Sequence, residues 1–169
     1  LVTGGTNTGC MELTGEASRS VHGINCIGIA PLGTFHGHEA LKGNRGEICG
    51  DYNPRQAPPK GPYALLDQHH SHFILLDTKA NPNNTYWGTE VSIRASFESY
   101  FAKLNNIDLI LLVIGGGPGT IKTVMDSLSS HEPILIIKNS GGVADMLAGM
   151  LTGDESVLVK VRQDPVLKK

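Results

Sequence analysis

The sequence has too few cysteines and too little positive charge for several classes of protein. Its three cysteines, Cys10, Cys26 and Cys49, are odd in number and show no CxxC spacing, which argues against a disulfide framework and against a zinc knuckle. They are typical of reduced thiols in a cytoplasmic protein. The formal net charge is −2 and the basic residues are scattered. We therefore expect no nucleic-acid partner and no direct contact with a membrane surface.

Long hydrophobic runs are also missing. The longest, Ile107–Ile114, is interrupted by Asp108 and is much shorter than the ~20 apolar residues that cross a bilayer. Nothing in the sequence resembles a signal peptide. The chain opens on "LVTGG", without an initiator Met, which reads as the end of a strand running into a glycine turn. We expect a cytoplasmic fragment of a longer protein that does not itself cross a membrane.

Short apolar segments alternate with helical patterns along the chain. The expected strands are Leu1–Val2, Asn25–Ala30, His72–Asp77, Leu109–Ile114, Ile134–Ile137 and a final Val157–Val161. The expected helices are Met11–Ser20, Glu90–Leu104, Thr120–Ser129 and Val143–Met150. This alternation predicts an α/β fold, a Rossmann-like parallel sheet with helices on both faces. We expect one domain over residues 1–151 with a long loop at 33–62, and residues 152–169 as its C-terminal extension.

Glycine is the most informative residue that is present, with 21 copies. Four glycine-containing turns each follow a predicted strand: "TGGTNTG" at 3–9, "PLGT" at 31–34, "GGGPGT" at 115–120 and "NSGG" at 139–142. In a parallel sheet these turns lie at one edge, where helix N-termini offer free N–H groups to an anion such as phosphate. The expected ligand-binding residues in these turns are Gly4, Gly5, Thr6, Thr8, Gly9, Gly116, Gly117, Pro118, Gly119, Thr120, Ser140 and Gly141. The alternative for each turn is a plain tight turn.

Common nucleotide and catalytic motifs are absent. "GGGPGTIKT" lacks the Gly-Lys pair of a P-loop, and Thr6 stands where the dinucleotide fingerprint requires its second glycine. The nucleophile elbow G-x-S-x-G is not found either. In "DQHHSH", an extended backbone would place His70 and His72 on one face and Asp67, His69 and Ser71 on the other. A face with two such residues is a poor metal site. We therefore expect no metal, and these residues to border a pocket.

Five motifs together resemble a known family. "LVTGGTNTGCM", "DQHHSHFILLD", "WGTEVSIR", "IGGGPGT" and "SGGVAD" match, in order and approximate spacing, the amino-terminal cytosolic homology region of melastatin-type TRP (TRPM) cation channels. That region is a SLOG (LSDAT) domain, more remotely similar to LOG or lysine decarboxylase-like Rossmann proteins. The resemblance covers about Leu1 to Leu151. It also implies that the first strand and helix of the fold lie upstream of this chain.

The resemblance implies a ligand-sensing domain without a cofactor, which binds ADP-ribose or a related nucleotide and regulates a channel. It further implies a homo-oligomer, a tetramer in a channel, with the parent protein in the plasma membrane. In nucleotide-binding members an aromatic residue before a glycine and a later arginine contact the ligand, and these correspond to Trp87, Gly88 and Arg94. Such members tend to have Arg where this chain has Gly142.

An enzymatic role is not indicated by the residues at the matching position. LOG enzymes carry P-G-G-x-G-T-x-x-E, and the position of its catalytic Glu falls on Thr123, which cannot supply a carboxylate. Asp126, one turn further along the predicted helix, is the alternative carboxylate. We therefore expect no catalysis. The alternatives are a LOG-like enzyme that hydrolyses an N-glycosidic bond and a ligand-free structural assembly domain.

Overall fold

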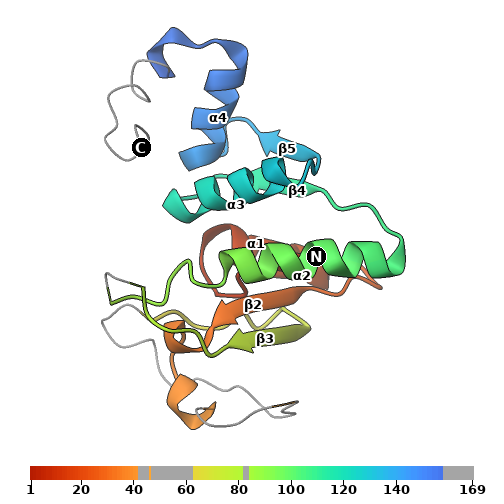
Figure 1. Ribbon diagram of the computed structural model, residues 1–169, viewed down its shortest axis with the longest axis vertical. Coiled ribbons are helices and arrows are strands. Elements are labelled where there is room, and N and C mark those ends of the chain that lie inside the picture. The colour runs from red at the N-terminus through yellow and green to blue at the C-terminus, as the bar shows by residue number, and fades with distance from the viewer. Residues whose placement is uncertain (42–45, 47–62, 82–83, 158–169) are drawn as a thin grey trace. The chain divides into compact units, whose positions relative to one another are not determined.

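The computed structural model describes residues 1–41, 46, 63–81 and 84–157. The chain divides into two compact units, Leu1–Arg94 and Ala95–Lys169. Figure 1 shows the elements of both units along the chain. Among the described residues, no helix combines the length and the apolar character needed to cross a membrane.

The first unit contains a parallel sheet of three strands in the order β1–β2–β3. These are β1 (Val2–Thr3), β2 (Ile27–Pro31) and β3 (His72–Leu76). In the register, Ile27 lies opposite both Val2 and His72, and β2 and β3 run side by side in Figure 1. The turns at 3–9 and 31–34 therefore leave the same edge of this sheet, as the sequence predicts.

Helix α1 (Gly9–Arg19) connects β1 to β2. Its buried residues are small, Gly15 and Ser18, whereas Leu13 is 61% exposed. Close approach of the helix backbone, rather than an apolar stripe, is what packs α1 onto the rest of the unit. After β2 come two short 3₁₀ helices, η1 (Leu32–Thr34) and η2 (His38–Leu41).

The core of the first unit is built around Phe35, which is fully buried with Leu32 and Leu66, and is extended by Phe73 and Leu75. The turn at 3–9 closes onto this unit through a contact between glycines. A β-carbon on Gly28 would lie 2.7 Å from the Gly5 Cα and 2.7 Å from the Phe73 ring, so neither β2 nor the turn has room for a side chain there.

Helix α2 (Val91–Asn105) begins in the first unit and continues into the second. The second unit contains two parallel strands, β4 (Leu111–Ile114) and β5 (Ile134–Ile137), with α3 (Pro118–Ser129) and α4 (Gly142–Thr152). Both helices contact both strands. The core of this unit is formed by Val113, Val124 and Ala144, while Leu112, Leu135 and Ile137 of the sheet are exposed.

The fold class predicted from the sequence, α/β with parallel strands and helices, is confirmed. The strands form two sheets, one in each unit. The four turns that were predicted to share one sheet edge are therefore divided between the two sheets, with two turns in each unit. The expected strand 157–161 is not supported at its start, because residues 155–157 are helical; the rest lies outside the described residues. Most of the predicted loop 33–62 also lies outside them.

Candidate functional site

The turn Thr3–Gly9 is held in place by the segment that precedes β3. The Asp67 amide donates to the Gly5 carbonyl at 2.9 Å, and the Asn7 amide donates to the Leu65 carbonyl at 2.7 Å. Thr6 is fully buried and forms an isolated antiparallel bridge with Leu66. The backbone of this turn is therefore fixed on the side that faces the protein.

The end of this turn leads into the uncapped N-terminus of α1. Thr8 is the N-cap residue but makes no side-chain capping hydrogen bond; its hydroxyl lies 3.1 Å from the Thr6 hydroxyl instead. The first amides of a helix have no acceptor within the helix, and together with the helix dipole they favour an anion. A β-carbon on Gly9 would meet none of the described residues within 4 Å, so these leave the approach to the amides open.

A positive charge lies next to the same turn. A β-carbon on Gly4 would lie 3.7 Å from Arg94 Nη1 and 2.7 Å from Met11 Sδ. Arg94 is in the first turn of α2 and belongs to the first unit, as the turn does. The structure therefore brings together two groups of predicted ligand residues, those of the turn Thr3–Gly9 and Arg94.

Trp87 and Gly88 lie in the turn before α2. The Trp87 side chain is 40% exposed, its carbonyl accepts a hydrogen bond from Asn81 Nδ2 at 3.3 Å, and Gly88 has a φ of +83°. Glu90, two residues on, is buried, and its Oε2 has no hydrogen-bond partner among the described residues. These residues share a unit with Arg94.

In the second unit, the glycines of "GGGPGT" divide into two kinds. Gly115 and Gly116 have φ of +58° and +92°, which favours glycine at both positions. Gly117 is the N-cap of α3 with a φ of −112°, without a side-chain capping bond. In the part of the chain that the structure describes, a β-carbon on Gly117 or Gly119 would meet no atom within 4 Å. The turn therefore requires glycine at positions 115 and 116, whereas no described contact requires it at positions 117 and 119.

The turn "NSGG" is bonded to the turn "GGGPGT". The Ala144 amide of α4 donates to the Gly115 carbonyl at 2.8 Å, so this helix N-terminus is partly occupied by protein. The Ser140 hydroxyl donates to the Ile137 carbonyl at 2.6 Å and accepts from the Gly115 amide at 2.8 Å. The Ser140 amide in turn donates to Asp145 Oδ1 at 3.1 Å. In this arrangement the Ser140 hydroxyl joins the two turns.

No carboxylate stands at the catalytic position of LOG enzymes. The Thr123 hydroxyl donates to the Gly119 carbonyl at 3.3 Å, and Asp126 Oδ2 lies 3.4 Å from Lys122 Nζ. The first is a hydrogen bond back to the helix backbone and the second an ion pair along the helix surface. Both contacts are local to α3.

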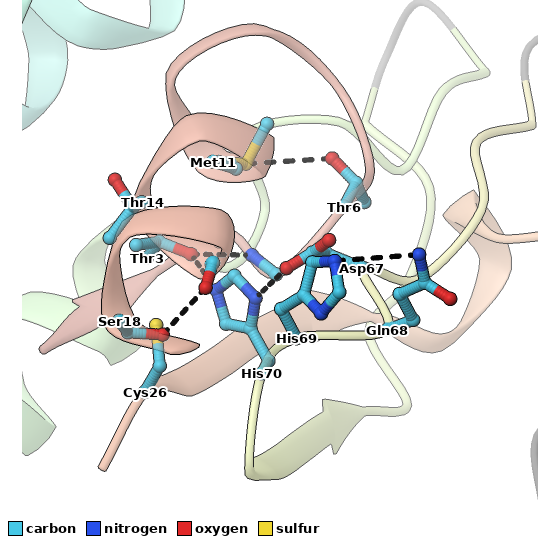
Figure 2. A network of polar contacts seen from close by, with 12 residues as sticks. Thr3, Thr6, Met11, Thr14, Ser18, Cys26, Asp67, Gln68, His69 and His70 are labelled. Atoms are coloured by element: carbon cyan, nitrogen blue, oxygen red, sulfur yellow. Dashed lines mark hydrogen bonds and ion pairs between the residues drawn. The ribbon is translucent and has the colours of Figure 1, made fainter. Parts of the chain in front are cut away.

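Sequence reasoning missed the buried network of Thr3, Asp67 and His70, which Figure 2 shows. His70 Nδ1 lies 2.6 Å from Asp67 Oδ2, and His70 Nε2 lies 2.7 Å from the Thr3 hydroxyl. The assignment of Asp67 and His70 to opposite faces was wrong, because residues 68–69 form a turn and the backbone is not extended there. Asp67 and His70 are three residues apart, and a turn brings side chains at that spacing together. Recognising the turn in the sequence would therefore have predicted the pair.

The remaining histidines of this segment do not join the network. His69 contacts Gln68, and His72 contacts the Ser71 hydroxyl. Within the part of the chain that the structure describes, no three His, Cys, Asp or Glu residues are placed to hold a metal ion.

Cys26 lies beside this network and is almost completely buried. Burial raises the pKa of its thiol, and a hydrogen bond with Ser18 partly opposes that shift. A thiol with a raised pKa is a poor nucleophile at neutral pH. Cys26 is therefore part of the packing of the first unit.

Comparison with known proteins places this chain in a family. A family profile described as "SLOG in TRPM" matches residues 1–164. The chain is 32% identical over 164 residues to the transient receptor potential cation channel subfamily M member 2 of Rattus norvegicus, covering 88% of this chain and 11% of that protein.

It is also 32% identical over 162 residues to subfamily M member 7 of Homo sapiens, and 30% identical over 163 residues to the channel trpm of Drosophila melanogaster. Each of these alignments covers 88% of this chain and 8% of the relative. The chain thus spans about a tenth or less of the curated relatives that it matches. The chain belongs to the SLOG family found in TRPM cation channels.

Proposed function

We propose that this chain is a ligand-sensing cytoplasmic part of a TRPM-type cation channel and binds a nucleotide-derived phosphate such as ADP-ribose. Occupation of the site regulates the channel, which is a homotetramer in the plasma membrane. The names of the relatives support the link to a cation channel. The phosphate ligand is supported by the geometry of the first unit.

The observation that carries the proposal is the position of Arg94 beside Gly4, at the turn that leads into the uncapped N-terminus of α1. A guanidinium presents two parallel N–H groups to phosphate oxygens, and the helix amides present further donors from a second direction. The exposed Thr8 hydroxyl lies at the same turn, whereas Thr6, a predicted ligand residue, is fully buried and contacts Thr8 from inside the protein. This combination of donors suits the phosphates of a dinucleotide-like ligand.

Trp87 supports a nucleotide, and not a simple phosphate, as the ligand. A partly exposed indole in the same unit is suited to stacking on an adenine ring. Binding rather than catalysis is favoured because the position of the LOG carboxylate holds Thr123, whose hydroxyl is bonded to its own helix, and because Asp126 pairs with Lys122.

The experiment is a calorimetric titration of the chain with ADP-ribose, repeated with Arg94→Gln and with Arg19→Gln. Arg19 is in the last turn of α1, and at 1.5 Å per residue the helix places it roughly 15 Å from the N-terminal amides. Arg94→Gln should weaken binding about ten- to a hundredfold, because one charge-assisted hydrogen bond contributes ~1.5–3 kcal/mol. Arg19→Gln should leave the affinity within about twofold, because its charge is exposed and screened.

Two results would contradict the proposal. Equal loss of affinity in both variants would mean that overall charge, and not the site beside Gly4, attracts the ligand. The absence of binding heat with the unmodified chain at millimolar ADP-ribose would favour a structural assembly domain without a ligand.

A further inference from the structure

A chain of hydrogen bonds runs from the buried carboxylate of Asp67 to the backbone of the proposed ligand turn. Asp67 Oδ2 bonds His70 Nδ1 at 2.6 Å, His70 Nε2 bonds the Thr3 hydroxyl at 2.7 Å, and the Gly5 amide donates to the same hydroxyl at 2.9 Å. Figure 2 shows Thr3 and Asp67 on either side of the His70 ring. The side chains of Asp67 and His70 are 1% and 0% exposed.

The Thr3 hydroxyl is the junction between the His70 ring and the turn. Its oxygen accepts the Gly5 amide proton and lies 2.7 Å from His70 Nε2. When the ring proton is on Nδ1, Nδ1 donates to Asp67 and Nε2 accepts the Thr3 hydroxyl proton. In this tautomer each donor along the path meets an acceptor.

Two features of this arrangement lower the stability of the folded chain. Gly15 lies in the middle of α1, where glycine is destabilising relative to alanine, and a β-carbon there would overlap the Asp67 carboxylate. Asp67 Oδ1 is buried and has no hydrogen-bond partner among the described residues. A buried polar group without a partner calls for a specific explanation, and a functional role is one such explanation.

We infer that Asp67 and His70 are positioning residues for the anion site: they orient the Thr3 hydroxyl, which holds the Gly5 amide and sets the path of the turn into α1. This inference rests on the proposed function. The network does not act as a catalytic hydroxyl–imidazole–carboxylate set, because the His70 ring is completely buried and the Thr3 oxygen is occupied by the Gly5 amide. Its effect on a ligand passes through the backbone of residues 3–9.

The test compares Thr3→Val, which removes the hydroxyl at nearly constant volume, with Thr3→Ser, which keeps it. The first readout is hydrogen exchange of the Gly5 amide, and the second is the nitrogen NMR spectrum of the His70 ring. Thr3→Val should speed Gly5 exchange at least tenfold and shift the Nε2 resonance. Thr3→Ser should stay close to the unmodified chain in both. His72→Asn, on an exposed histidine, is the matched control and should change neither readout.

The third readout is ADP-ribose affinity per folded molecule. Thr3→Val and Asp67→Asn should weaken the affinity about tenfold, whereas Thr3→Ser should keep it close to that of the unmodified chain. If Asp67→Asn does not fold, the comparison of Thr3→Val with Thr3→Ser still tests the positioning role. Unchanged Gly5 exchange and His70 resonances in Thr3→Val would overturn the network. An unchanged affinity, with exchange altered, would overturn the positioning role. If the unmodified chain binds no ADP-ribose, the proposed function fails separately, because the first two readouts need no ligand.

Discussion

The substitution Gly119→Ala in α3 separates a glycine that admits a ligand from one that serves only a turn. Gly119 is the second residue of α3, and a β-carbon there would have no described neighbour within 4 Å. Its φ is outside the left-handed region, so alanine fits without strain. Alanine in place of a helical glycine should add about 0.5–1 kcal/mol to the free energy of unfolding. For a protein of this size the melting temperature should rise by about 1–4 °C.

Binding should change in the opposite direction if a phosphate reaches the first amides of α3. The new methyl group would lie where the ligand oxygens approach, and loss of one charge-assisted hydrogen bond of ~1.5–3 kcal/mol lowers affinity about ten- to a hundredfold. A variant that is more stable and binds more weakly cannot be explained by damage to the fold. The assay is the melting temperature and calorimetric ADP-ribose affinity of the same preparation.

Gly115→Ala is the matched control in the same turn. Gly115 has a φ of +58°, and its β-carbon would lie 3.2 Å from the Ser140 carbonyl oxygen, so alanine should lower stability by about 1 kcal/mol. If Gly119→Ala raises the melting temperature and leaves the affinity unchanged, the amides of α3 do not contact the ligand. If Gly119→Ala lowers the melting temperature, the account of open space at this position is refuted.

Three further predictions concern the first unit. Cys26, whose burial raises the pKa of its thiol, should react with a thiol reagent at neutral pH much more slowly than the partly exposed Cys10, with mass spectrometry assigning the modified residue; equal rates would contradict its burial. Gly28→Ala should destabilise the chain by more than about 1 kcal/mol in urea titration, because its methyl would meet Gly5 across 2.7 Å, and a neutral effect would contradict that close approach. Phe35→Ala should cost about 3–5 kcal/mol in the same titration, since Phe35 is 0% exposed, and a loss below ~1 kcal/mol would show that it lies outside the core.

The regular elements could be predicted from the sequence because most strands are short apolar runs and most helices begin or end at recognisable residues. Ile134–Ile137 is observed at the predicted positions. Helix α3 begins at Pro118, two residues before the predicted Thr120, because proline is well suited to the first turn of a helix. The buried face of α1 could not be predicted, because it is made of Gly15 and Ser18 rather than of apolar residues. Patterns of hydrophobicity do not report a helix that packs through its backbone.

The candidate site was only partly accessible from the sequence for the same physical reason. Glycine clusters mark the turns, but which glycine has a positive φ depends on the path of the chain, and it is Gly115 and Gly116 rather than Gly117 and Gly119. The pairing of Asp67 with His70 depends on a turn over residues 67–70, which Asp67 at the first position favours but which Gln68 and His69 do not indicate. The position of Arg94 beside Gly4 joins residues far apart in the chain, and only the three-dimensional structure brings them together.

The central claim, that an anion binds where the turn Thr3–Gly9 enters α1, is tested most directly by following backbone amide resonances during a titration with ADP-ribose. The account predicts that the largest shifts occur at the amides of Gly9, Cys10 and Met11, the uncapped first turn of α1, and at Gly4 beside Arg94. These shifts should saturate together and should be reduced in Arg94→Gln. A saturable titration whose shifts leave the first turn of α1 unchanged would contradict the claim.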